Sequence, residues 1–183
     1  MAKKGNRKKS PARMIFGWIL FIAAVLAVLV ILIPLVGATV DVSGSAMSPA
    51  VNAGDRIAVN RLAYLLTNPK RGDVIQFRSA QDAGTVFLRR VVALPGETVQ
   101  IRDGSVYINQ TSLPEPYASG ILQYAGTAAT PLTLSEDEYF VMSDNRSNNF
   151  DSRDPTVGTV KRNTVSGKAW LKVLPFRKFR LIL

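Results

Sequence analysis

A run of 27 residues without a charged side chain, residues 14–40, constrains this chain more than any other feature. A helix rises about 1.5 Å per residue, so the run is long enough to cross the roughly 30 Å apolar core of a bilayer. The apolar core of a cleaved secretory signal is shorter, about 7 to 15 residues. The sequence therefore predicts one transmembrane helix over residues 14–40, in preference to a cleaved signal.

Charges on either side of the run predict its orientation. Residues 1–13 form a basic tail with six Lys and Arg side chains and no acid, and the next basic residue is Arg56. Positive residues that flank a membrane helix favour the cytoplasmic side. We therefore expect a single-pass plasma membrane protein with a cytoplasmic N-terminus. Residues 41–183 would form a domain outside the cell, with the lipid bilayer as one partner.

Composition excludes several kinds of chemistry. Cysteine and histidine are both absent, which removes disulfides, cysteine nucleophiles, imidazole bases and nearly every zinc or haem site. We expect no cofactor and no metal. The net charge of +10 comes from 23 basic and 13 acidic side chains, and six of the basic ones lie in the tail. The remaining chain is only moderately basic and carries no nucleic-acid motif, so no nucleic-acid partner is expected.

The domain that follows the hydrophobic run is predicted to be mainly β. Short β-prone runs alternate with turn signals, without long helical periodicity. Asp103-Gly104 between two such runs is typical of a hairpin turn that needs positive φ, and residues 113–131 form a variable excursion rich in Pro, Gly, Ala and Thr. The predicted strands cover residues 56–62, 73–78, 87–94, 98–101, 106–109, 139–142 and 164–173.

The C-terminal segment from Lys168 interleaves basic and aromatic side chains. Lys172, Arg177 and Lys178 alternate with Trp170 and Phe176. Two interpretations stay open at this stage: a last strand with solvated basic side chains, or contact with an anionic bilayer surface.

Four sequence blocks carry a resemblance to a known family. They are residues 42–49 (VSGSAMSP), 70–77 (KRGDVIQF), 87–99 (FLRRVVALPGETV) and 143–153 (SDNRSNNFDSR). Together with the preceding hydrophobic run, they resemble the type I signal peptidases, peptidase family S26. The resemblance implies a membrane-tethered β domain that cuts signal peptides with a Ser nucleophile and a Lys general base. It also implies a cleft that holds an extended segment at a sheet edge.

Both catalytic positions of that family are altered here. The nucleophile position, directly before Met47 and three residues before Pro49, is Ala46, and the base position is Arg89. Alanine has no nucleophile, and an arginine with a pKa above about 12 stays protonated in a protein. The resemblance therefore predicts a catalytically inactive homologue.

Further departures surround the same positions, while a framework is retained. Ala50, Ser143 and Asn149 replace the family's Thr, Gly and Ser, the last of which supports the lysine. We expect Asp151 and Arg153 to form a charge pair that braces the site. The retained framework consists of Met47, Pro49, Asp144, Asn145, Arg146, Asp151, Ser152 and Arg153.

Three explanations of the altered residues stay open: a naturally inactive homologue, an engineered inactive form, and a displaced active site. In the last, Ser43, Ser45 or Ser48 would attack and another lysine would act as base. Side chains of adjacent residues in a strand point to opposite faces, so Ser45 would point away from position 46. Nothing in the sequence indicates that Lys70, Lys161 or Lys168 is desolvated.

Arg89 places a permanent positive charge near the cleft, which predicts a changed ligand preference. Burying a guanidinium without a partner is costly in free energy. We expect it either to reach solvent or to meet a carboxylate. The leading hypothesis is a tethered chaperone or scaffold that binds secreted precursor or pilin peptides. The resemblance extends to inactive homologues that act beside sortases in pilus assembly in Gram-positive bacteria. The alternatives are an active signal peptidase with displaced catalytic residues, and an accessory protein that only grips lipid.

Overall fold

The computed structural model describes residues 11–36, 38–79, 85–175 and 179–182. The chain divides into two units, Met1–Leu35 and Val36–Leu183. Most of the predicted basic tail and Phe176, Arg177 and Lys178 of the C-terminal segment lie outside the described residues. The second unit is called the β domain below.

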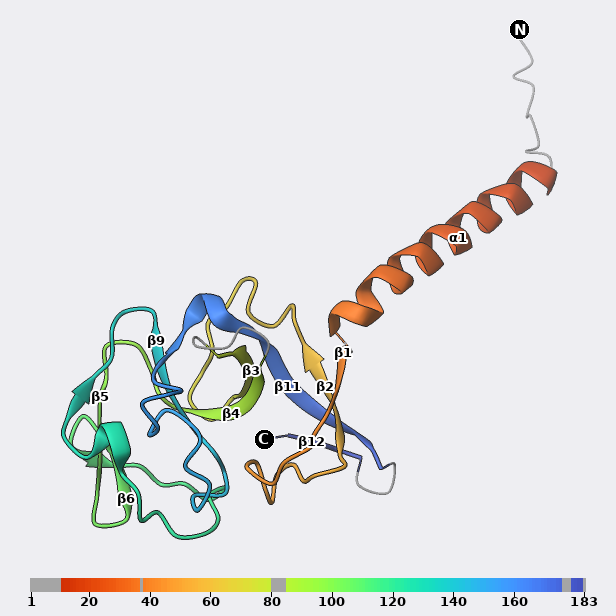
Figure 1. Cartoon of the computed structure of the whole chain (residues 1–183). Helices are drawn as coiled ribbons and strands as arrows, with labels where there is room; N and C mark the ends of the chain where they lie inside the picture. The colour runs from red at the N-terminus through yellow and green to blue at the C-terminus, as the bar shows by residue number, and fades with distance from the viewer. Residues whose placement is uncertain (1–10, 37, 80–84, 176–178, 183) are drawn as a thin grey trace, which may run out of the picture. The chain divides into compact units, whose positions relative to one another are not determined.

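The helix α1 covers Pro11–Val36, and all of it except its last residue belongs to the first unit (Figure 1). Proline is favoured in the first turn of a helix, where its missing N–H has no partner to lose. In the described part of the chain, no helix combines the length and the apolar character that crossing a membrane requires. Residues 38–40 of the uncharged run belong to strand β1, Ala38–Asp41, which pairs antiparallel with β2, Arg56–Asn60.

The β domain is built on an eight-stranded sheet with the order β1-β2-β11-β3-β4-β9-β10, to which β12 is added on β11 (Figure 1). All of its pairs are antiparallel. The remaining strands of this sheet are β3 Val74–Arg78, β4 Val86–Ala93, β9 Glu138–Met142, β10 Val160–Lys161, β11 Val165–Leu174 and β12 Arg180–Leu181.

A second, four-stranded sheet has the order β7-β6-β5-β8. Its strands are β5 Thr98–Arg102, β6 Ser105–Ile108, β7 Thr111–Ser112 and β8 Leu132–Thr133. The predicted excursion over residues 113–131 contains no strand, and its one named element is the 3-10 turn Gly126–Ala128. A second 3-10 turn covers Arg162–Thr164. The mainly β class and all seven predicted strands are confirmed, while β1 and the two-residue strands were not predicted.

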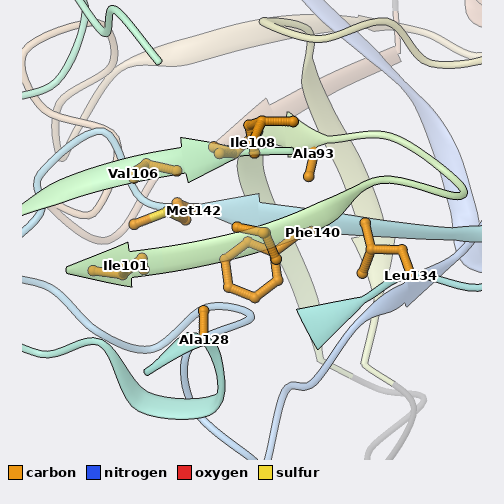
Figure 2. Packing of buried hydrophobic residues seen from close by; sticks show 10 residues of the cluster. Ala93, Ile101, Val106, Ile108, Ala128, Leu134, Phe140 and Met142 are labelled. Atoms are coloured by element: carbon orange, nitrogen blue, oxygen red, sulfur yellow. The ribbon is translucent and has the colours of Figure 1, made fainter. Parts of the chain in front are cut away.

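Buried side chains from both sheets pack into a shared cluster. Ile101 and Val106 of the small sheet meet Phe140 and Met142 of β9, with Ala128 against them (Figure 2). Burial alternates along β5 and β6, because every second side chain of a strand points to the same side of the sheet. The buried side chains of these two strands therefore form one apolar face. A separate cluster contains Met47, Val51, Ile57, Val59, Val74, Ala169 and Ile182.

The hairpin turn predicted at Asp103-Gly104 is present. Arg102 pairs with Ser105, so the loop has two residues, with φ of 51° at Asp103 and 69° at Gly104. A two-residue loop with positive φ at both positions matches the twist of the flanking strands.

Replacing Gly104 by alanine should destabilise the β domain by about 1 kcal/mol, because a Cβ disfavours left-handed backbone. An added Cβ would meet only the Leu122 carbonyl oxygen, at an ordinary 3.8 Å, so the cost lies in the backbone. Urea denaturation of the full chain measures it. Gly44→Ala is the matched control, since Gly44 is not in the left-handed region and its Cβ would meet nothing within 4 Å. Equal midpoints for the two variants would contradict the prediction.

Candidate functional site

Ala46 and Arg89, which the family resemblance matches to the nucleophile and the base, lie on the wall of one cavity of about 340 Å³ in the β domain. Ala46 contributes from the turn after β1, and Arg89 contributes from β4. Ser43 and Ser45 also line it. The lining consists of residues 40–47 and 85–89 with Asn148 and Phe150. The structure therefore brings together the residues that the family resemblance singled out from distant parts of the chain.

Ala46 is held by a compact turn that is anchored in the core. Met47 and Val51 are buried, and the Val51 N–H donates to the Met47 carbonyl oxygen at 2.7 Å. The Ala46 carbonyl oxygen accepts from the Asn145 N–H at 2.9 Å. Residues 44–50 form bends and turns, so the strand alternation argued for Ser45 does not apply there. Ser45 is exposed and lies on the same cavity wall as Ala46.

Arg89 is 7% exposed and is bound by backbone carbonyl groups. Its Nε and Nη2 donate to the Phe150 carbonyl oxygen at 3.0 and 2.6 Å, and Nη1 donates to the Leu88 carbonyl oxygen at 2.6 Å. Its guanidinium carbon lies 5.3 Å from the centre of the Phe87 ring. The expectation that Arg89 reaches solvent or meets a carboxylate was wrong, because it donates three hydrogen bonds to carbonyl oxygens of the chain instead.

The neighbouring Arg90 forms a buried ion pair that the sequence did not predict. Its Nε and Nη2 donate to the two carboxylate oxygens of Asp144, each at 2.7 Å, and Nη1 donates to the Gly72 carbonyl oxygen. Both side chains of the pair are at most 1% exposed. The ring of Tyr117 has its centre 4.3 Å from the Arg90 guanidinium carbon. This bidentate pair ties β4 to the block at residues 143–153.

The charge pair expected between Asp151 and Arg153 is present and fully buried, with 2.7 Å between Nη2 and Oδ2. Asp151 also accepts the Ser143 N–H at 2.8 Å, and the Ser152 hydroxyl oxygen accepts the Val141 N–H at 3.0 Å. Arg153 donates to the carbonyl oxygens of Arg146 and Asn148. These contacts shape the loop that carries the cavity residues Asn148 and Phe150.

Arg146 supports the excursion over residues 113–131 and lies outside the lining of this cavity. Its Nη2 lies 2.6 Å from Glu115 Oε1, while Nε and Nη1 have no hydrogen-bond partner in the described residues. Burial raises the pKa of the Glu115 carboxyl, and Arg146 opposes that shift. Asn145 N–H holds the Ala46 turn, as described above. Asn149, which the resemblance matches to the family's supporting Ser, is exposed and lines a different cavity.

Among the described residues, no lysine lines the cavity that contains Ala46 and Arg89. Lys168 Nζ lies 2.6 Å from Asp73 Oδ1. Lys172 is fully buried, which the sequence did not indicate, and it is paired with the buried carboxylate of Asp55. The same described residues contain no group of three acidic side chains that could hold a metal ion.

Two strand segments that have an unpaired edge within the described part of the chain border the cavity. β1 is the first strand of the sheet order, and its residues Val40 and Asp41 line the cavity. Among the described residues, residues 86–89 of β4 pair only with β3, whereas Arg90, Val91 and Ala93 pair with β9. Unpaired backbone groups at a strand edge can accept an extended segment as an additional strand. The arrangement is therefore a cleft suited to a peptide.

Comparisons with known proteins find sequences that are similar to this chain over most of its length. The family model described as "Signal peptidase, peptidase S26" matches residues 15–174. Signal peptidase I of Bacillus licheniformis is 31% identical over 190 residues, covering 97% of this chain and 96% of that protein. Probable signal peptidase I-2 of Synechocystis sp. is 30% identical over 146 residues, 77% of this chain and 65% of that protein.

A crystal structure of a signal peptidase I from Enterococcus faecalis is 36% identical and covers 56% of this chain and 97% of the other, with a TM-score of 0.46. The family match extends over most of the sequence and includes all four blocks. This chain therefore belongs to the signal peptidase family, peptidase S26.

Proposed function

We propose that this signal peptidase homologue binds an extended peptide in the cleft between β1 and β4 without cleaving it. The observation that carries the proposal is that one cavity of about 340 Å³ is lined by both Ala46 and Arg89, the residues that the family resemblance matches to the nucleophile and the base. A hydroxyl nucleophile and a neutral base are both required for this chemistry, and neither side chain supplies one.

The surrounding framework supports binding in the absence of catalysis. Asp144 and Asp151 each keep a buried arginine partner, and the Ala46 turn is fastened to this block through the Asn145 N–H. These contacts shape both walls of the cleft. A family member that keeps the walls and lacks the reacting groups is suited to hold a secreted precursor or a pilin segment, as a chaperone or scaffold beside sortases.

A displaced active site is the second candidate. What favours it is that Ser45 is exposed on the cavity wall beside Ala46. It needs a base, and Arg89 is the single cationic side chain among the described residues that line the cavity. We therefore rank binding above displaced catalysis. Ser45→Ala would abolish any cleavage that depends on this serine.

The setting that we propose is the outer side of a bacterial plasma membrane. The motivating feature is the uncharged run over residues 14–40 directly after six basic side chains. Such a flank favours a cytoplasmic N-terminus, which would leave the β domain outside. Protease protection of the C-terminus in intact and lysed cells tests this orientation.

The function is tested with full-length protein in detergent, a secretory precursor, and a fluorescent alanine-rich ten-residue peptide. We expect the peptide to bind, as measured by anisotropy, and the precursor to remain intact on gels. Ala46→Trp should weaken binding by at least about tenfold, because an indole would fill the cleft. Ala129→Trp, at an exposed position away from the cleft, is the matched control. Precursor cleavage would contradict the proposal, and so would unchanged binding by Ala46→Trp.

A further inference from the structure

The positive charge of Arg89 in the cleft is not balanced by an anion among its contacts within the described chain. Among the described residues, its guanidinium donates three hydrogen bonds, all to the carbonyl oxygens of Phe150 and Leu88. In the described part of the chain, no carboxylate forms an ion pair with it. A guanidinium has five N–H donors, so these three bonds leave two N–H groups for a further acceptor.

Nearby charges do not neutralise Arg89. Burial lowers its pKa to about 10, which leaves it protonated at neutral pH. Asp151 acts in the opposite direction, but Asp151 is already paired with Arg153, whose charge again disfavours the Arg89 cation. A buried cation that is not balanced by an anion is costly in free energy.

The other charged side chain on the described part of the cleft wall, Asp41, already has a partner of opposite charge. Among the described lining residues the only carboxylate is that of Asp41, and the exposed Arg56 binds both of its oxygens at 2.6 and 3.1 Å. The other polar side chains on this wall include the hydroxyl groups of Ser43 and Ser45, which carry no charge. Arg89 is therefore the unmatched charge that a ligand in the cleft would meet.

We infer that the peptide segment held in this cleft carries a carboxylate that pairs with the Arg89 guanidinium. This inference rests on the proposed peptide-binding function. A carboxylate fits the planar donor fork of arginine and forms charge-assisted hydrogen bonds with it. The carboxylate comes from an Asp or Glu side chain or from a free C-terminus, both of which present the same two oxygens.

Three matched peptides distinguish these sources. The first is a ten-residue alanine-rich peptide with one central Asp, and the second has Asn at that position, both with blocked ends. The third has Asn and a free C-terminal carboxylate. We expect the full-length protein to bind the first or the third at least about tenfold more tightly than the second at low salt, with the difference shrinking as salt screens the pair. The carboxylate peptide that binds more tightly identifies the source.

Variants of Arg89 identify the residue that discriminates. Arg89→Gln should remove the preference for the carboxylate, and Arg89→Lys, which keeps a cation, should retain part of it. Arg102→Gln removes an exposed cation of β5 and should leave the preference unchanged. Circular dichroism of each variant establishes that it is folded.

The outcomes separate this inference from the proposed function. If all three peptides bind equally, or if Arg89→Gln keeps the preference, the inference is overturned while peptide binding stands. If no peptide binds at any salt concentration, both fail.

Discussion

The double variant Ala46→Ser, Arg89→Lys is expected to cleave a secretory precursor that the unaltered protein leaves intact. The first change places a hydroxyl on the turn that is fixed by Met47 and by the Asn145 N–H. The second places an amine at a position that is 7% exposed. Desolvation disfavours the charged form of a lysine, so the amine can be neutral and take the serine proton.

The magnitude follows from the chemistry of each group. A positioned general base contributes about 10² to 10⁴ in rate, and without a nucleophile there is no acyl-enzyme. We therefore expect the double variant to exceed each single variant by at least about a hundredfold. The measurement is a gel time course with precursor in detergent. The rate should rise with pH as the introduced lysine loses its proton and then level off above its pKa.

The single variants are the matched controls. Ala46→Ser alone keeps Arg89, which cannot accept a proton, and Arg89→Lys alone has no nucleophile. An inactive double variant that still binds the peptide would contradict the claim that the cleft keeps the family's catalytic geometry. Adding Asn149→Ser would not be expected to rescue it, because Asn149 is exposed and lines another cavity.

The strands could be predicted because their patterns are local. Alternating burial in β5 and β6 and the Asp103-Gly104 turn follow from residues within a short window. β1 could not be predicted, since its four residues are as uncharged as the run before them, apart from Asp41. Its strand conformation depends on pairing with β2, which the local sequence does not encode.

The sequence could single out Ala46 and Arg89, but it could not predict the partners of the charges around them. The four blocks identify Ala46 and Arg89, and the structure places both on one cavity. The Phe150 carbonyl oxygen that binds Arg89 lies 61 residues along the chain, and Asp144 lies 54 residues from Arg90. Adjacent arginines in a strand predict opposite faces, and their acceptors depend on how the 143–153 block folds back on β4.

Asp144→Ala is expected to destabilise the β domain by about 3 to 5 kcal/mol, because it leaves Arg90 buried without its anion. Both side chains of this pair are at most 1% exposed, and two hydrogen bonds of 2.7 Å are lost together. Urea denaturation of the full chain, monitored by near-ultraviolet circular dichroism, measures the loss in the free energy of unfolding. Asp41→Ala removes the carboxylate of an exposed pair and should change the midpoint little. Equal effects of the two changes would contradict the prediction.

The double variant Asp144→Leu, Arg90→Met tests whether the pair stabilises the fold or specifies the cleft. Replacing both charges with apolar groups leaves no unpaired ion, so most of the stability lost in Asp144→Ala should return. Peptide binding should not return to the same extent, because the pair joins β4 to the block whose Asn145 N–H holds the Ala46 turn. If stability recovers and peptide binding stays weak, the role of the Asp144–Arg90 pair is to maintain the geometry of the cleft. Full recovery of both would contradict that assignment and leave the Asp151–Arg153 pair as the brace of this loop.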